Sequence, residues 1–220
     1  MPDGNDNHPL VYNGWTMRVR HASQDPARLM LMLHGWTGDE NSMWVFTRNL
    51  PQDLFIAAPR APHAVREGGY SWRPPLPGSR GLPTLLDLKP AALRLIKLVD
   101  ELSDSIGVNA SRFDLTGFSQ GGAMANCLAL LFPERIHRAA VLAGFMPGGV
   151  DDLLERRVLR GIPFFVAHGT EDQLVPVERA RESIGFLERG GAQVSFCEAE
   201  VGHKVSADCL RGLETFFSAA

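Results

Sequence analysis

The feature that most constrains the fold is a regular alternation of short apolar runs with longer segments of helical periodicity. The runs are apolar at nearly every residue and stop at glycine, proline or serine, as expected for parallel strands buried on both faces. This alternation predicts an α/β architecture. The runs are "RLMLMLHG" (28–35), "DLFIAAPR" (53–60), "RFDLTGFS" (112–119), "RAAVLAGF" (138–145) and "PFFVAHGT" (163–170).

Two more segments are expected at the edges of this sheet. "AQVSFCEAEV" (192–201) mixes polar and apolar residues, which indicates a strand near an edge, and "LVYNGWTMRVR" (10–20) is typical of an additional antiparallel edge strand. Pro90 is expected in the first turn of the first predicted helix, where proline is tolerated. The predicted helices cover residues 85–107, 121–133, 175–191 and 206–219.

Together these elements predict one α/β domain over residues 1–220, with a mostly parallel, doubly wound sheet and helices on both faces. Ligands of such sheets bind beyond the carboxyl ends of the strands, so polar residues that follow strands are candidates for chemistry. The stretch 61–84 follows one strand and is rich in proline and glycine. A loop of this length is more often functional than idle, although a plain surface excursion fits the same composition.

Composition excludes several other classes of protein. The net charge is −3 and the basic residues are scattered, so no nucleic-acid partner is expected. No apolar stretch approaches the roughly 18 residues of a membrane span, and the N-terminus lacks the pattern of a secretory signal. Cys127, Cys197 and Cys209 form no CxxC pair and are expected to be small, free, buried residues in a reducing compartment. We therefore expect a cytoplasmic protein, either a monomer or a homodimer.

Ser119 lies in "GFSQG" (117–121), between a predicted strand and a predicted helix. The pattern G-x-S-x-G in this position is typical of a nucleophile elbow, in which the serine takes a strained conformation and flanking glycines allow strand and helix to approach closely. Glycine and serine also gather in ordinary turns, so a purely structural turn is the alternative. The strand before the motif and the helix after it favour the nucleophile.

A serine hydroxyl needs a base, and the base needs an acid that orients it. In a sheet of this kind the chain order is serine, acid, histidine. His203 follows the last predicted strand, and Asp172 follows the strand before it, which gives Ser119, Asp172 and His203 in that order. Asp172 is also a candidate helix cap, Glu171 is its nearby rival for the role of the acid, and His203 alone would fit a plain loop histidine. The combination on three appropriate loops favours a catalytic triad.

Backbone N–H groups are needed to bind the oxyanion that forms during acyl transfer. Gln120, the residue after the serine, is expected to supply one of them. Trp36, in the glycine-containing loop "LHGWTGDEN" (33–41), is expected to supply the other. His34 in the same loop is interpreted as a structural histidine that bonds its own loop. No cluster of histidine, aspartate and cysteine has metal-ligand spacing, so neither a metal nor another cofactor is expected.

Several longer motifs extend this pattern over residues 29 to 203: "LHGWTGDE", "APRAPHAVREGGYSW", "DLTGFSQGGAMA", "HGTEDQLVP" and the pair "GH". On these motifs the chain resembles the phospholipase/carboxylesterase group of α/β-hydrolases, small serine esterases that include the acyl-protein thioesterases. The resemblance implies that Ser119 is the nucleophile, that Asp172 and His203 complete the triad, and that Trp36 and Gln120 bind the oxyanion. The implied substrate is a small-molecule ester or thioester with a small to medium acyl group, and 220 residues leave no room for a cap domain.

Substrate choice is expected to depend on the loop at 61–84, which by resemblance lines the acyl side of the pocket. Trp72 would offer an apolar wall there. Arg73 is either a surface charge paired with a nearby carboxylate or a guanidinium that faces the groove and favours anionic esters. The sequence departs from the family around "SWRPPLPG" and "GHKVS". A non-catalytic ligand-binding protein of the same fold is the alternative function, although such proteins usually lack a triad member.

Overall fold

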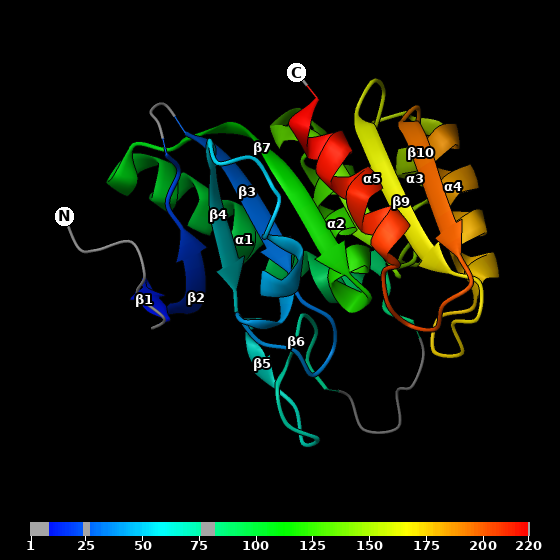
Figure 1. Ribbon diagram of the computed structural model, residues 1–220, viewed down its shortest axis with the longest axis horizontal. Coiled ribbons are helices and arrows are strands. Elements are labelled where there is room, and N and C mark those ends of the chain that lie inside the picture. Colours follow the sequence, from blue (N-terminus) through cyan, green and yellow to red (C-terminus); the bar gives the residue numbers. More distant parts are fainter. Residues whose placement is uncertain (1–8, 24–26, 76–81, 220) are drawn as a thin grey trace.

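One eight-stranded sheet forms the centre of the protein in the computed structural model (Figure 1). The structure describes residues 9–23, 27–75 and 82–219. From one edge to the other, the strands are β1 (Leu10–Tyr12), β2 (Trp15–Arg20), β4 (Leu54–Pro59), β3 (Arg28–Leu33), β7 (Asn109–Phe118), β8 (Ile136–Leu142), β9 (Pro163–Gly169) and β10 (Gln193–Ala199).

The pairing of these strands agrees with the sequence patterns. From β4 to β10 every neighbouring pair is parallel, while β2 pairs with β4 and β1 with β2 in the antiparallel sense. The prediction of a single edge strand over 10–20 is wrong, because this segment is a hairpin of two strands. Asn13 and Gly14 form its turn with φ angles of 46° and 78°. An Asn-Gly pair favours this tight turn because both residues tolerate positive φ.

Helices cover both faces of the sheet, as predicted. In Figure 1, α5 crosses the near face while α1 and α2 lie behind the strands. A capping box between Thr84 and Asp87 starts α1 five residues before Pro90, so the expectation that Pro90 lies in the first turn is wrong. The helices are α1 (Leu85–Ile106), α2 (Gln120–Leu131), α3 (Asp151–Glu155), α4 (Val177–Arg189) and α5 (Ala207–Ser218), with the short 3₁₀ helices η1 (Ser42–Phe46) and η2 (Pro133–Arg135).

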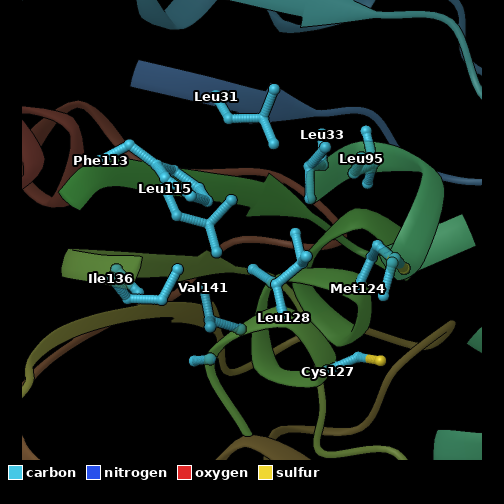
Figure 2. Close-up of a cluster of buried hydrophobic side chains, with 14 of the residues drawn as sticks. Leu31, Leu33, Leu95, Phe113, Leu115, Met124, Cys127, Leu128, Ile136 and Val141 are labelled. Carbon is cyan, nitrogen blue, oxygen red and sulfur yellow. The ribbon is translucent and has the colours of Figure 1, made fainter. Parts of the chain in front are cut away.

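The two faces of the sheet have separate hydrophobic cores, because successive strand residues point in opposite directions. On β3, Leu31 and Leu33 pack into the larger core with α1 and α2, which Figure 2 shows in close-up. Met30 and Met32 point to the other face and pack into a smaller core with η1 and α5. Burial on both faces explains why the central runs are apolar at almost every residue.

Two of the three cysteines form a disulfide, which corrects the expectation that all three are free. Cys197 on β10 and Cys209 on α5 are bonded, with 5.6 Å between their Cα atoms. This separation lies in the usual range for a disulfide. Cys127 is free and buried, as expected. Because two of the cysteines are paired, the cysteines give no support to a reducing compartment. The cytoplasmic location stays a prediction.

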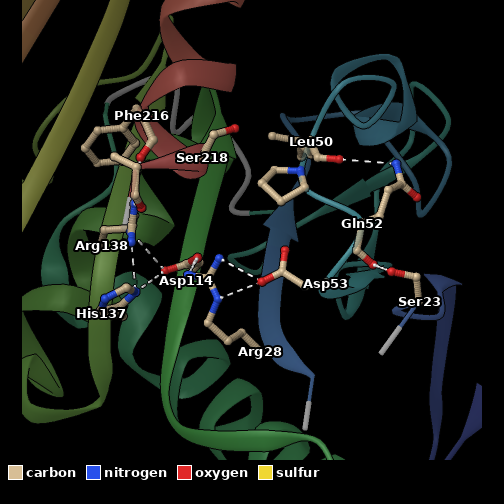
Figure 3. A network of polar contacts seen from close by, with 12 residues as sticks. Ser23, Arg28, Leu50, Gln52, Asp53, Asp114, His137, Arg138, Phe216 and Ser218 are labelled. Atoms are coloured by element: carbon tan, nitrogen blue, oxygen red, sulfur yellow. Dashed lines mark hydrogen bonds and ion pairs between the residues drawn. The ribbon is translucent and has the colours of Figure 1, made fainter. Parts of the chain in front are cut away.

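A charged network connects the sheet to α5 (Figure 3). It lies toward the amino ends of the parallel strands. The buried carboxylate of Asp114 contacts Arg28 at 3.3 Å, His137 at 2.7 Å and Arg138 at 3.6 Å. Arg138 also donates hydrogen bonds to the carbonyl oxygens of Phe216 and Ala219. The network therefore fixes the last turn of α5 to the start of β8.

We predict that Asp114→Asn destabilises the fold by about 3 kcal/mol, because it removes the negative charge beside Arg28 and leaves the buried Arg138 without its counter-charge. The measurement is the free energy of unfolding from a urea titration. Asp208→Asn is the matched control, since Asp208 is exposed and pairs with Arg211 on the surface. The control should change stability by less than about 0.5 kcal/mol. A change of that small size in Asp114→Asn would contradict the structural role of the network.

Candidate active site

Ser119 occupies a sharp turn between β7 and α2. Its φ and ψ angles are 54° and −115°, a positive-φ conformation that is strained for any residue with a Cβ atom. The flanking glycines explain how the chain makes this turn. A Cβ atom on Gly117 would overlap the carbonyl oxygen of Gly121, and one on Gly121 would overlap the carbonyl oxygen of Leu33. The strand, the helix and the neighbouring strand are thus too close together for any other residue at these two positions.

Asp172 and His203 are in direct contact. His203, on the loop between β10 and α5, lies with its Nδ1 2.6 Å from Asp172 Oδ2, on the loop after β9. The Asp172 side chain has no exposed surface, and that of His203 is 18% exposed. A buried carboxylate that accepts from Nδ1 fixes the orientation of the ring and leaves Nε2 free to act as a base.

Asp172 also shapes its own loop, so the expected alternative role as a cap is compatible with the contact to His203. Its Oδ1 accepts hydrogen bonds from the backbone N–H groups of Leu174 and Val175, both at 2.9 Å. Glu171, the rival acid, is exposed, and the histidine bonds to its neighbour instead. One oxygen of the buried carboxylate therefore holds the loop and the other faces the imidazole.

His203 lies beside the serine turn. Its ring is tilted against the ring of Phe118, with 5.0 Å between the centroids, and Phe118 directly precedes Ser119. The structure thus places His203, the predicted base, against Phe118, the neighbour of the predicted nucleophile Ser119. In Figure 1 the loop that carries the histidine lies at the lower end of the sheet, at the carboxyl ends of the parallel strands. This is where α/β sheets bind ligands.

The two predicted oxyanion donors lie near this turn, Gln120 directly after Ser119 and Trp36 on a neighbouring loop. A Cβ atom on Gly35 would lie 3.3 Å from the Cβ of Ser119, so the loop that carries Trp36 approaches the serine closely. Among the described residues, neither Trp36 N–H nor Gln120 N–H donates a hydrogen bond to a protein acceptor. Donors without protein acceptors beside a strained serine are suited to hold a developing negative charge.

His34 is a structural residue, as predicted. It is buried, its Nε2 accepts a hydrogen bond from Ala61 N–H, and its Nδ1 lies 2.7 Å from the carbonyl oxygen of Gly35. Burial lowers the pKa of its imidazole below the ordinary value. A neutral ring that donates from Nδ1 and accepts at Nε2 connects the Gly35 loop to the end of β4.

The first part of the 61–84 loop contacts the loop that carries Trp36. Residues 76–81 lie outside the described part. The first part contains a hairpin of β5 (His63–Ala64) and β6 (Tyr70–Ser71). Thr37 N–H donates to Tyr70 O, and Tyr70 N–H donates to Gly38 O. These bonds fix the loop that presents Trp36.

The expectation that Trp72 forms an apolar wall of the groove is wrong, because the side chain is completely buried. Its Nε1 donates to the carbonyl oxygen of His34 at 2.7 Å, and its backbone N–H donates to Gln120 Oε1 at 2.9 Å. Trp72 therefore connects the two predicted oxyanion loops from inside the protein. The sequence pattern could not show whether this aromatic ring points outward or inward.

Arg73 forms an ion pair with Asp87 at 3.9 Å, and its side chain is 16% exposed. Pairing with a nearby carboxylate, one of the two roles considered for Arg73, is present in the structure. The contact connects the loop to the capped first turn of α1.

An ion pair between the buried Glu40 and the partly exposed Arg60 was missed in the sequence. The guanidinium lies 2.7 and 2.8 Å from the two carboxylate oxygens and also stacks on Tyr70, 4.6 Å from the ring centre. The hydrogen bonds from Arg60 lower the pKa of Glu40. Arg60 directly follows β4, and Glu40 lies in the loop after β3, so their place in loops after strands was the available signal. The pair holds the Trp36 loop against the hairpin.

A cavity of about 410 Å³ adjoins the site on the side of η1. Lys204, next to the predicted base, lies at its rim and is exposed. The volume is within the usual range of small-molecule sites. Its lining is mainly apolar and includes Trp36, Met43, Val45, Phe46, Phe118 and Val205.

Two features are absent from residues 9–23, 27–75 and 82–219. No group of three or more histidine, cysteine, aspartate or glutamate side chains in these ranges could hold a metal ion. No helix formed by the same residues is long and apolar enough to cross a membrane.

Solved structures share the architecture of this protein. A carboxylesterase from Mesorhizobium loti superposes with a TM-score of 0.83, at 19% identity, over 98% of this chain and 100% of that one. At this low identity the likeness shows the fold alone. The fold is that of the α/β-hydrolases, here with a single domain.

The chain belongs to the phospholipase/carboxylesterase family, whose sequence pattern matches residues 16–220. A probable carboxylesterase from Arabidopsis thaliana, described as SOBER1-like, is 28% identical over 170 residues, which are 74% of this chain and 64% of the relative. Acyl-protein thioesterase 1 from Emericella nidulans is 37% identical over 105 residues, 44% of this chain and 41% of the relative. The chain thus spans less than two thirds of the length of these relatives.

We predict that Gly121→Ala prevents formation of the native elbow, because its Cβ atom would overlap the Leu33 carbonyl oxygen. The loss should exceed about 3 kcal/mol in the free energy of unfolding, since neither strand nor helix can move apart locally. Gly185→Ala is the matched control. Gly185 lies in α4 with open space around its Cα, so the change should stabilise by about 0.5–1 kcal/mol. Equal effects of the two substitutions would contradict the close approach at the elbow.

Proposed function

We propose that this protein is a serine hydrolase that cleaves carboxylic ester or thioester bonds through an acyl-enzyme. The contact between His203 Nδ1 and Asp172 Oδ2 at 2.6 Å carries the proposal, because it orients an imidazole beside a serine held at positive φ. Membership of the phospholipase/carboxylesterase family supports the same reaction. The names of relatives, carboxylesterase and acyl-protein thioesterase, agree with it.

In the first half of the reaction, Ser119 Oγ attacks the carbonyl carbon of the ester while His203 Nε2 takes the hydroxyl proton. The backbone N–H groups of Trp36 and Gln120 stabilise the oxyanion. Asp172 stabilises the imidazolium that forms. The tetrahedral intermediate collapses, the alcohol or thiol departs with the proton from Nε2, and an acyl group remains on the serine.

In the second half, water attacks the acyl-enzyme and gives its proton to His203 Nε2. A second tetrahedral intermediate collapses, the proton returns to Ser119 Oγ, and the carboxylic acid is released. This sequence uses only groups of the chain and a water molecule. It therefore needs no redox cofactor.

The apolar cavity beside η1 is proposed as the binding site for the acyl group. It adjoins Trp36 and Phe118, so an acyl chain lying in it would have its carbonyl carbon near the serine. Residues such as Val45 and Phe46 offer apolar surface without hydrogen-bond donors, which favours hydrocarbon over polar groups. The proposed substrates are accordingly esters with small to medium acyl chains.

Two substitutions should distinguish the proposed acid from its neighbour. We predict that Asp172→Asn lowers kcat by about 10⁴-fold, because the histidine then loses the carboxylate that fixes its tautomer. Glu171→Gln should stay near the wild-type value, since Glu171 is exposed. The measurement is steady-state hydrolysis of a p-nitrophenyl ester by both variants. The reverse pattern would overturn the choice of acid.

Ser119→Ala completes this test and addresses the non-catalytic alternative. A fluorophosphonate should add one label to the wild-type protein by intact mass and none to Ser119→Ala. If the wild-type protein binds ester ligands but neither hydrolyses them nor takes the label, the alternative of a ligand-binding protein is correct.

The acyl-binding cavity can be tested by narrowing it. We predict that Val45→Trp lowers kcat/KM about tenfold or more for octanoyl esters and less than about threefold for acetyl esters, because the indole fills space that only long chains need. Val11→Trp is the matched control. Val11 and Val45 are 72% and 71% exposed, and Val11 lies on the far edge strand. A uniform loss across a p-nitrophenyl ester series would place the acyl chain elsewhere.

A further inference from the structure

The disulfide between Cys197 and Cys209 encloses the loop that carries His203. Cys197 lies on β10, two residues before the strand ends, and Cys209 lies in the first turn of α5. We propose that this bond is a positioning device for His203, so that hydrolysis depends on the oxidised state of the pair. The inference rests on the proposed function of the histidine as the base.

The loop has few other attachments on the side that leads to α5. On the β10 side, Glu171 N–H donates to Val201 O at 3.1 Å, which joins the loop to the Asp172 segment. Beyond His203, the backbone hydrogen bond from Lys204 N–H to Gly202 O at 2.7 Å is local to the loop. Ser206 then caps α5 by accepting from Cys209 N–H. The second half of the loop therefore takes its position from the first turn of α5 and from Val205, which packs against the smaller core.

The strand at the other end of the disulfide also has limited support. β10 is the edge strand, bonded along one side only, to β9. Its residues are exposed or partly buried, with none of them fully buried. The disulfide joins this edge to α5, whose Leu213 and Phe217 are buried in the smaller core. The disulfide thus restrains both ends of the His203 loop relative to the smaller core.

The bond is open to chemical reduction. Cys197 is the more exposed residue of the pair, since Cys209 is buried, so we expect a small dithiol to attack at Cys197 Sγ. A thiolate of the dithiol forms a mixed disulfide with Cys197 and releases the Cys209 thiolate, which takes a proton. The second thiol of the dithiol then displaces Cys197 as a thiol and leaves the reagent as a cyclic disulfide. Two electrons and two protons pass from the dithiol to the protein.

The consequence for catalysis follows from the geometry of the base. His203 must keep its contact with Asp172 while its Nε2 faces the serine. A loop with more freedom spends less time in this arrangement, and a displacement of about 1 Å can lower a rate by as much as 100-fold. Lys204 and Val205 of the enclosed loop also line the cavity beside η1, but most of its lining comes from other segments. Reduction should therefore lower kcat more than it raises KM.

The thiol content is measured first. Denatured protein without a reductant should react with a thiol reagent at one cysteine, and reduced protein at three. The single thiol is Cys127, which is buried and whose pKa is raised to about 12 by burial, so it should not react in the native state. Three reactive thiols in freshly purified, unreduced protein would overturn the proposal.

The kinetic test compares oxidised, dithiothreitol-reduced and reoxidised wild-type protein at a temperature well below all melting transitions. We expect kcat to fall about tenfold on reduction, KM to change less than about threefold, and reoxidation to restore kcat. Cys197→Ala/Cys209→Ala should behave like the reduced protein and be insensitive to dithiothreitol. Cys127→Ala is the control and should keep the full response.

The outcomes separate this inference from the proposed function. If the oxidised protein takes a fluorophosphonate label at Ser119 and hydrolyses esters, and reduction lowers the melting temperature but leaves kcat unchanged, the disulfide is only structural and the inference fails alone. If the oxidised protein takes no label, the proposed function fails first.

Discussion

The close approach of three backbone segments at the serine turn is the constraint on which the rest of the site depends. β7 enters the turn, α2 leaves it, and β3 lies directly against it at Gly121. Because the contact is made by backbone atoms, the position of Ser119 is set by the sheet rather than by side-chain packing. The residue takes a strained conformation that the surrounding fold stabilises. The apolar runs on both sides provide the rigidity that this strain requires.

Around this turn, buried polar contacts position the loops that surround it. The side chain of Gln120 accepts from Trp72 N–H, and the Trp72 indole donates to the carbonyl oxygen of His34. The ion pair of Glu40 with Arg60 holds the same loop from its other side. These contacts connect the loops after β3, β4 and β7 into one network. A catalytic geometry assembled from loops requires such support, because loops alone have few packing contacts.

The sequence was sufficient to predict the features that leave a local signature. Strands buried on both faces show as apolar runs, and the order of Asp172 and His203 along the chain was enough to expect them near each other. Features that depend on three-dimensional side-chain direction were not predictable. Trp72 could have pointed outward, and the pairing of Cys197 with Cys209 follows from the packing of α5 on the sheet. The hairpin at 10–20 had a local signal in its Asn-Gly turn, but its first strand has only three residues.

The two edges of the sheet differ in how they avoid pairing with another molecule. An exposed edge strand presents free backbone groups that can template aggregation. At one edge β1 is too short to offer much surface. At the other edge β10 is seven residues long and partly apolar, with Phe196 38% exposed. Its covalent bond to α5 means that the strand cannot peel away from β9 unless the helix moves with it. The disulfide therefore also protects the sheet against intermolecular strand exchange.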